Sequence, residues 1–226
     1  MSIRSGKVRE AIDIMLMFKN MKCCDIYENY LKNYYEHLFG IQTCGRLYLN
    51  NRPGQAIYEP TPYRYLVSYF RKHPFEKGKG YVDFGCGMGR TVFLAAHFGC
   101  TQSIGVDVNV DMYNQAVKNR SHFEKKRKQH EEVSFFHCPA ESFLIKDSYC
   151  YFYFFNPFHL KYFIKTINNI LRSYQASPRK IRLILYYVAE EYIRYLSKQT
   201  EFQLLESIFY REGACFQIYT IKASNI

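Results

Sequence analysis

Three closely spaced glycines give this sequence its clearest chemical signal. Residues 81–90 read Y-V-D-F-G-C-G-M-G-R, an apolar strand followed by a glycine-rich turn and the start of a helix. Because glycine has no side chain, Gly85 and Gly87 allow positive φ and let the backbone lie directly against a ligand. The N–H groups at the start of the helix suit a carboxylate or phosphate. The segment therefore predicts a nucleotide cradle, and its expected contact residues are Asp83, Gly85, Cys86, Gly87 and Gly89.

The spacing of these glycines argues against a dinucleotide ligand. Dinucleotide turns follow the pattern G-x-G-x-x-G, whereas the third glycine of this turn, Gly89, comes one residue early and Arg90 follows it. A long side chain at that place would crowd the close contact between strand and helix and the pyrophosphate. NAD is therefore disfavoured.

An acidic residue follows the next predicted strand at a distance that suits ribose binding. Residues 103–107 read S-I-G-V-D, and Asp107 lies 22 residues beyond Gly85. In a strand-turn-helix-strand unit this distance returns the chain to the neighbouring parallel strand, which places the carboxylate beside the glycine turn. There it can accept hydrogen bonds from both hydroxyls of a ribose. We therefore expect Asp107 and the adjacent Val108 to contact the nucleoside.

These residues resemble the first motifs of class I S-adenosylmethionine-dependent methyltransferases. The glycine turn matches the pattern D-x-G-x-G-x-G, and in that family an acid at the place of Asp107 holds the adenosine ribose. The resemblance covers roughly residues 58–223 and is strongest in the first half. It implies a Rossmann-like fold, S-adenosyl-L-methionine as the cofactor and methyl transfer as the activity.

The resemblance also implies an adenine contact after the third predicted strand. Residues 133–138 read as a strand, and the loop behind it has Pro139 where the family usually carries an acid. We expect the Ala140 amide to meet a ring nitrogen, while Glu141 or a water molecule binds the amino group. The alternative is that Glu141 is an ordinary exposed loop residue.

A second motif follows a strand that is predicted to be buried on both faces. Residues 150–155 have the length and aromatic content of such a strand and lead into Asn156-Pro157-Phe158. This triplet resembles the N-P-P-Y/F or D-P-P-Y motif of amino-group methyltransferases, in a bacterial-type branch whose N-P-F motif lacks the second proline. Ligands of open α/β sheets lie at the carboxyl ends of the strands, so the triplet is expected beside the glycine turn.

The resemblance implies a catalytic role for the triplet through positioning. The side-chain oxygen of Asn156 and the carbonyl of Pro157 could accept both N–H groups of a target amine or amide, with Asn156 also near the cofactor. Phe158 would stack on a planar target or wall a side-chain tunnel. The alternative is that Asn-Pro merely ends a strand and starts a helix.

The sequence leaves the methyl acceptor open. A protein side chain, a nucleic-acid base or a small amine would suit transfer to nitrogen, and O-methylation of a small molecule is an alternative if His159 or Tyr186 acts as a base. A non-catalytic module that keeps the cofactor pocket and works through a basic surface is another alternative. The net charge of +11 would attract a nucleic acid or another acidic partner, although the basic run at residues 125–128 also suits a solvated helix end.

The chain has the length of one α/β domain with an extension. With 226 residues, 48% of them apolar, it can bury one full core. Residues 1–57 are expected to form a helical N-terminal extension that caps the substrate, by analogy with the family. Residues 58–226 are expected to form the methyltransferase domain, in which Tyr58 and Thr61 contact the cofactor.

The periodic patterns predict a three-layer αβα sandwich around a seven-stranded, mostly parallel sheet. Thr61-Pro62 reads as the N-cap and first residue of a helix. Helical periodicity marks residues 25–38, 109–128 and 160–174. Residues 182–188 read as the fifth strand, and two further strands around Gly213 predict a C-terminal antiparallel hairpin.

Cysteine usage and apolar runs predict a cytoplasmic protein without metal. The eight cysteines include no C-x-x-C pair, which favours free thiols over disulfides or zinc, and no histidine pair has metal-ligand spacing. The apolar runs at residues 14–18 and 149–155 are too short to span a bilayer. The sequence does not indicate an oligomeric state.

Overall fold

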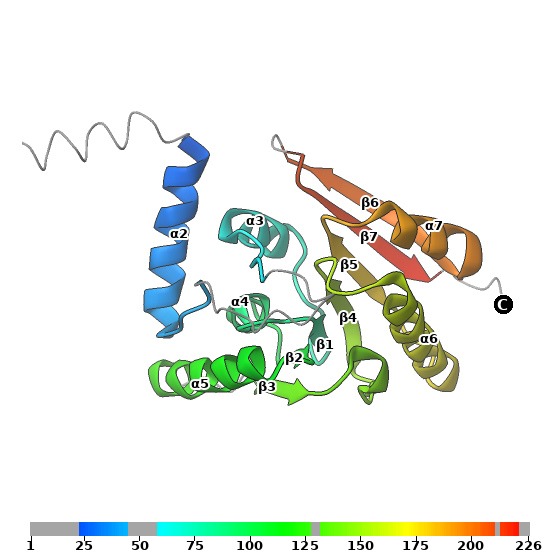
Figure 1. The fold of residues 1–226 in the computed structure, drawn as a ribbon, viewed down its shortest axis with the longest axis horizontal. Coiled ribbons are helices and arrows are strands. Elements are labelled where there is room, and N and C mark those ends of the chain that lie inside the picture. The colour runs from blue at the N-terminus through cyan, green and yellow to red at the C-terminus, as the bar shows by residue number, and fades with distance from the viewer. Residues whose placement is uncertain (1–22, 45–57, 128–131, 211–212, 222–226) are drawn as a thin grey trace, which may run out of the picture.

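Seven strands form one sheet in the order β3-β2-β1-β4-β5-β7-β6 (Figure 1). The computed structural model describes residues 23–44, 58–127, 132–210 and 213–221. The first five strands run parallel, and the last two form an antiparallel hairpin that pairs with β5. The strands are β1 (Gly80–Phe84), β2 (Gln102–Asp107), β3 (Glu132–His137), β4 (Tyr149–Phe154), β5 (Arg182–Tyr186), β6 (Phe202–Phe209) and β7 (Cys215–Ile221).

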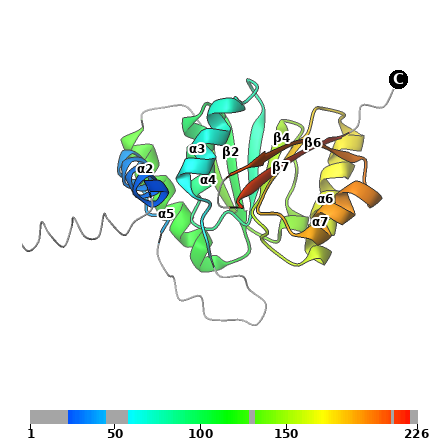
Figure 2. The same cartoon turned by 90° about the horizontal axis from the view of Figure 1, so that it is seen from above.

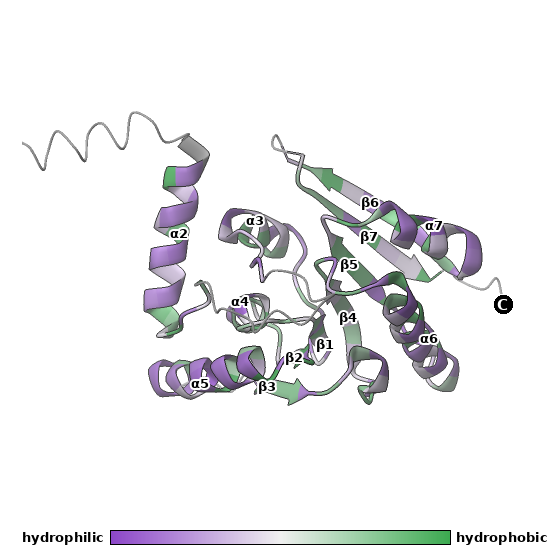
Figure 3. Cartoon of the chain, in the orientation of Figure 1, coloured by the Kyte–Doolittle hydropathy of each residue, from purple (hydrophilic) through white to green (hydrophobic). Residues whose placement is uncertain are grey.

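Helices cover both faces of the sheet, which confirms the predicted three-layer α/β sandwich. Alternate residues of β1 enter two separate cores: Tyr81 packs with α3, α4 and α5, whereas Val82 and Phe84 pack with α6 and α7. Figure 3 shows that the central strands are hydrophobic while α2 and α5 are largely hydrophilic. The helices are α2 (Cys23–Phe39), α3 (Tyr63–Lys72), α4 (Arg90–His97), α5 (Val110–Lys126), η1 (Ala140–Ser142), α6 (Leu160–Ala176) and α7 (Glu190–Gln199).

The topology gathers the candidate site at one edge of the sheet. Strand order runs outward from β1 to β2 and β3 on one side and to β4 and β5 on the other. Such a reversal is the place where ligands bind in open α/β sheets. In the register, Asp83 lies beside Gly105 of β2 and Tyr153 of β4, so the loops that leave these strands meet at their carboxyl ends.

The described part of the N-terminal extension packs against the helical layer. The Tyr35 ring of α2 stacks on Tyr63 of α3 with centroids 5.5 Å apart, and Phe39 meets Phe123 of α5 at 5.4 Å. Figure 2 shows α2 beside α3 and α5, at the end of the molecule away from α6 and α7. Residues 1–22 and 45–57 lie outside the described residues, so the division at residue 57 and the cap over the substrate stay predictions.

The start of α3 differs from the prediction. The helix begins at Tyr63, with Pro62 as its N-cap, one residue later than the Thr61-Pro62 pattern suggests. Glu28 of α2 caps it instead, since its carboxylate accepts the N–H groups of Tyr63 at 2.7 Å and Arg64 at 2.9 Å. A carboxylate also favours the positive end of the helix dipole.

Two other differences lie after β5. This strand ends at Tyr186, two residues before the predicted end, because Tyr187 has a φ of 51° that an extended strand does not allow. The sequence analysis missed α7, a helix of ten residues that buries Tyr192, Tyr195 and Leu196 on one side. Their spacing of three and four residues is the helical signal that could have found it.

Candidate active site

The predicted glycine turn follows β1 and leads into α4. Gly85, Gly87 and Gly89 have φ values of 82°, 53° and 90°, which side-chain-bearing residues rarely adopt. A Cβ atom at Gly85 would come within 2.5 Å of the Pro157 ring, and one at Gly87 would collide with the ring of Tyr58. The turn is therefore enclosed between two residues that the sequence analysis placed in the site.

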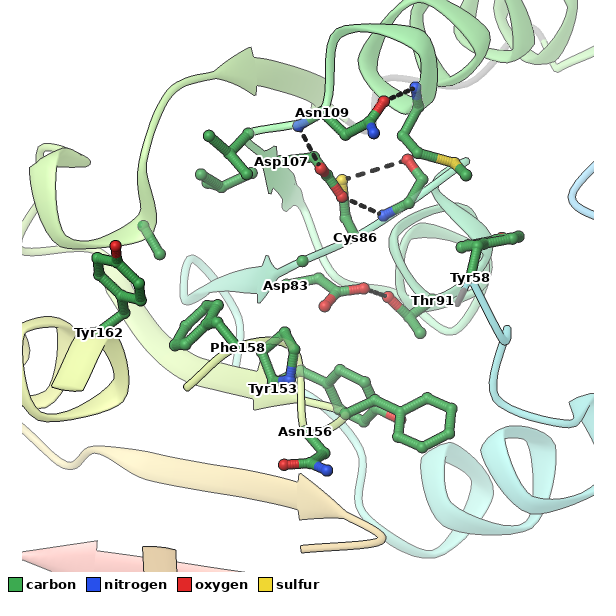
Figure 4. A pocket seen from close by; sticks show the side chains of 18 of the residues that line it. Tyr58, Asp83, Cys86, Thr91, Asp107, Asn109, Tyr153, Asn156, Phe158 and Tyr162 are labelled. Carbon is green, nitrogen blue, oxygen red and sulfur yellow. Dashed lines mark hydrogen bonds between the residues drawn. The ribbon is translucent and has the colours of Figure 1, made fainter. Parts of the chain in front are cut away.

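Asp107 holds this turn in place. Its Oδ2 accepts the Gly87 N–H at 2.8 Å, and its Oδ1 accepts the Asn109 N–H at 2.8 Å (Figure 4). Burial raises the pKa of the Asp107 carboxyl, and the two backbone N–H bonds act in the opposite direction. The Gly87 amide is thus engaged rather than free for a ligand. Each carboxylate oxygen still has capacity for a second hydrogen bond.

One cavity of about 540 Å³ joins nearly all of the predicted site residues. This size lies in the range of small-molecule and cofactor pockets. The predicted residues that line it are Tyr58, Thr61, Asp83, Gly85, Cys86, Gly87, Asp107, Val108, Ala140, Glu141, Asn156, Pro157 and Phe158.

Gly89 is the predicted cofactor residue that does not line the cavity. It is the left-handed N-cap of α4, and a Cβ atom there would meet the Phe135 ring at 2.6 Å. Its glycine is explained by the positive φ and by close packing of the helix on β3. The geometry therefore explains this glycine without a direct contact to the cofactor.

Asp83 is a buried carboxyl at the centre of the cavity wall. It is 3% exposed, and its Oδ2 accepts a hydrogen bond from the Thr91 hydroxyl of α4. Burial raises the pKa of Asp83 to about 7, against the opposing effect of the Thr91 bond, and the Asp107 charge adds to the rise. Near neutral pH this group therefore exchanges between the acid and the carboxylate.

Tyr153 of β4 connects the sheet to the segment that precedes α3. Its hydroxyl shares a hydrogen bond of 2.6 Å with the Thr61 hydroxyl. Burial raises the pKa of Tyr153 well above its usual value, so the phenol stays protonated. Thr61, which is itself buried, is thereby fixed beside the cavity.

The loops after β2 and β3 form the opposite end of the cavity. Val108 is exposed there, and the His137 ring donates to its carbonyl at 3.1 Å. Ala140 is buried in η1, and Glu141 is half-buried beside it. Asn109, two residues after Asp107, caps α5 by accepting the N–H groups of Asp111 and Met112.

The Asn156-Pro157-Phe158 triplet enters the cavity mainly through its last two residues. Pro157 lies against Gly85, and the Phe158 carbonyl accepts a hydrogen bond from the Tyr192 hydroxyl of α7. The Asn156 side chain is exposed and in Figure 4 points away from Asp83 and Asp107. Its φ of 39° lies in the left-handed region, which asparagine tolerates better than most residues.

A second strained residue lies next to Asn156. Tyr187 has a φ of 51° and is 62% exposed, and these two are the non-glycine residues with positive φ in the described part of the chain. Phe154 pairs with Leu185, so Asn156 and Tyr187 leave the neighbouring strands β4 and β5 at the same level. Such strain costs on the order of 1–3 kcal/mol and concentrates at functional sites. Phe155 and Tyr186 meet edge to face beside them, with centroids 4.8 Å apart.

Several cavity residues were missed or judged differently from the sequence. Thr91, Tyr153 and Tyr162 line the cavity, although no motif marks them. Tyr153 could have been found because it shares a strand face and a register position with Asp83. His159 also lines the cavity, whereas Tyr186 does not, and burial raises the pKa of Tyr186 far above the range that suits a base.

Other chemistry has no counterpart in the described residues. They contain no group of three or more His, Cys, Asp and Glu that could hold a metal ion. The cysteines at 44, 86, 100, 138, 150 and 215 are free thiols. Among the helices that the structure describes, none combines the length and apolar character that a bilayer crossing needs.

Comparison with known proteins links the site region to a methyltransferase family. The family described as "Histone methylation protein DOT1" matches residues 47–148, a little under half of the chain. The match includes the glycine turn, Asp107 and the loop around Ala140. No curated protein sequence matches the chain.

Solved methyltransferase structures share the fold at low sequence identity. The ribosomal protein L11 methylase from Lactobacillus delbrueckii subsp. bulgaricus has a TM-score of 0.54 and 10% identity, over 73% of this chain and 81% of its own. The RNA methyltransferase from Salinibacter ruber, in complex with S-adenosyl-L-homocysteine, has a TM-score of 0.52 and 16% identity, over 74% and 97%. The rRNA methylase from Streptococcus thermophilus has a TM-score of 0.52 and 12% identity, over 75% and 100%.

The family match and the fold agree with the resemblance seen in the glycine turn and Asp107. Both motifs line one cavity at the carboxyl edge of the sheet. The predicted resemblance to the class I S-adenosylmethionine-dependent methyltransferase superfamily is confirmed by the family match over residues 47–148 and by the shared fold.

Proposed function

We propose that this methyltransferase transfers a methyl group to an acceptor nitrogen at the carboxyl edge of β1 and β4. The observation that carries the proposal is that the Asn156-Pro157-Phe158 triplet shares one cavity with the glycine turn and Asp107. S-adenosyl-L-methionine supplies an electrophilic methyl group on a sulfonium. The protein then has to bind the cofactor, orient the acceptor and exclude water.

The cavity residues fit the cofactor by the chemistry of their donors and acceptors. The second acceptor positions of the Asp107 carboxylate suit two ribose hydroxyls. The backbone of Ala140 and the Glu141 carboxylate suit the adenine edge, next to the exposed Val108. Asp83 and the start of α4 offer a carboxyl and N–H groups for the amino and carboxylate ends of the methionine part.

The acceptor is proposed to enter beside β4 and β5. The carbonyl of Pro157 and the side-chain oxygen of Asn156 would accept its N–H groups and so direct the nitrogen lone pair. The exposed Asn156 carboxamide would turn toward the cavity by a change of side-chain rotamer. Phe158 and Tyr162 provide aromatic walls for the acceptor group.

The proposal extends to the chemical class of the methyl acceptor. The matching family is described by histone methylation, and the similar structures include a ribosomal protein methylase and RNA methylases. A protein side chain is compatible with the aromatic walls formed by Phe158 and Tyr162, and a nucleic-acid base is compatible with the net charge of +11. We therefore propose a nitrogen of a macromolecule, with a small amine as the competing outcome.

An unbiased labelling experiment tests this proposal. The protein is incubated with cofactor carrying a labelled methyl group and with cell extract, and label is then sought in protein, nucleic acid and small molecules. Acid- and base-stability of the labelled product separates methyl-nitrogen from methyl-ester bonds. Tight S-adenosylhomocysteine binding without label in any fraction would contradict catalysis. That outcome would favour the non-catalytic module, for which the outward direction of Asn156 is the supporting observation.

A further inference from the structure

Asn119 of α5 joins the glycine turn to the N-terminal extension. Its side chain is 1% exposed. The Nδ2 group donates to the Gln42 carbonyl at 2.9 Å and to the Met88 carbonyl at 3.0 Å, while Oδ1 accepts the Gln42 N–H at 3.1 Å. One buried carboxamide thus binds both backbone groups of Gln42 and a carbonyl of the turn.

Arg90 makes a second buried connection from the other end of the same turn. It is 4% exposed, and its Nε donates to the Thr43 hydroxyl oxygen at 2.9 Å. Its Nη1 donates to the Thr61 carbonyl at 3.0 Å. The guanidinium lies 3.6 Å from the Glu36 carboxylate and over the Tyr63 ring, which compensates its burial.

Thr43 is the point at which these contacts meet. Its hydroxyl donates to Glu36 at 2.7 Å while accepting from Arg90, and its carbonyl accepts the Tyr58 hydroxyl at 3.0 Å. The Tyr58 ring in turn covers Gly87. The segment from Tyr58 to Thr61 is therefore fixed at one end by Thr43 and at the other by Arg90 and Tyr153.

We propose that Arg90 and Asn119 are positioning residues for the cofactor site, and that residues 41–44 of the extension are a structural part of that site. The two side chains set the place of the turn and of the Tyr58–Thr61 segment that faces it across the cavity. Cofactor affinity then depends on the contacts that these two side chains make to residues 41–44 of the extension. The inference rests on the proposed binding of the cofactor beside Asp107.

Three variants test this inference by calorimetric titration with S-adenosylhomocysteine. Arg90→Lys keeps the charge but loses the forked geometry, Asn119→Ala removes the carboxamide, and Thr43→Val removes the hydroxyl at nearly constant volume. Each is expected to weaken binding about tenfold, as the loss of one or two buried polar contacts implies. At saturating cofactor, kcat should remain close to that of the unmodified protein, because the acceptor groups are unchanged.

The matched control is Glu28→Gln, which weakens a separate polar connection between α2 and the domain, the cap of α3. It should lower thermal stability by a similar amount but leave the affinity for S-adenosylhomocysteine unchanged. The positioning role is overturned if all four variants lose affinity in proportion to their loss of Tm. It is also overturned if Arg90→Lys, Asn119→Ala and Thr43→Val bind S-adenosylhomocysteine as tightly as the unmodified protein. Absence of binding by the unmodified protein would instead overturn the proposed function, so the two failures are distinguishable.

Discussion

Asp107 accepts the N–H of Gly87 at 2.8 Å, so the acid at the end of β2 holds the turn that follows β1. Its carboxylate therefore has two tasks, since it shapes the turn and offers its other acceptor positions to a ligand. Asp107→Ala is expected to weaken S-adenosylhomocysteine binding about 100-fold, because charge-assisted hydrogen bonds to two hydroxyls are lost. Isothermal titration calorimetry measures this change.

Asp111→Ala provides the control for that variant. Asp111 is an exposed acid in the first turn of α5, four residues away, and it does not line the cavity. Its loss changes the net charge equally but should leave affinity within about twofold, as for most surface substitutions. Equal losses of affinity in both variants would mean that general charge, and not the ribose contact, is responsible.

The buried Asp83 predicts a pH dependence of stability. Its pKa is raised to about 7 in the folded protein by burial, above the ordinary value that applies to the unfolded chain. Between about pH 4 and 7 the folded form binds the proton and the unfolded form does not, so this group's contribution to stability falls as pH rises through that window. Above pH 7 the contribution is lost.

Asp83→Asn should remove this dependence, because an amide does not titrate and its oxygen can still accept the Thr91 hydroxyl. The free energy of unfolding is measured by urea denaturation of both proteins from pH 5 to 8. The difference, original minus variant, should decrease by a few kcal/mol with rising pH and then level off. Parallel pH curves would show that Asp83 has an ordinary pKa.

The sequence predicted those parts of the site that depend on local spacing. The glycine turn, Asp107 and the start of α5 each follow from a few adjacent residues, and the alternation of short strands and helices was enough for the sheet topology. Connections between distant segments could not be predicted in this way. Asn119 and Gln42 are 77 residues apart, and their contact exists only because α2 packs on α5.

Backbone conformation at the strand ends was also beyond the sequence. Nothing in the Asn-Pro pattern indicates that Asn156 has positive φ and directs its side chain outward. The role of Thr61 was likewise not predictable, because its sequence pattern is typical of an N-cap. In the structure its hydroxyl bonds to Tyr153, and the carboxylate of Glu28 caps α3 in its place. At Thr61, long-range contacts thus outweigh a local propensity of modest energy.

The proposed role of Asn156 predicts a separation of binding from catalysis. Asn156→Ala should leave S-adenosylhomocysteine affinity unchanged and lower kcat by about 100-fold, since an acceptor-orienting group is removed. Asn156→Gly removes the same carboxamide while relieving the positive φ, so it should show the same kcat at higher stability than the alanine variant. Loss of cofactor binding in the glycine variant would assign Asn156 to the cofactor site instead.

The strained Tyr187 predicts an acceptor-side residue that no motif marks. It leaves β5 level with Asn156, is largely exposed, and is held by its N–H bond of 3.0 Å to the Cys215 carbonyl.

If the Tyr187 ring contacts the acceptor, Tyr187→Ala should lower kcat/KM for the acceptor about tenfold, the size expected for loss of one aromatic contact. Tyr187→Phe keeps the ring and should retain the activity. Cofactor affinity should be equal in both variants. Steady-state kinetics on the acceptor found by labelling measures the difference, and an alanine variant as active as the phenylalanine one would exclude Tyr187 from the acceptor site.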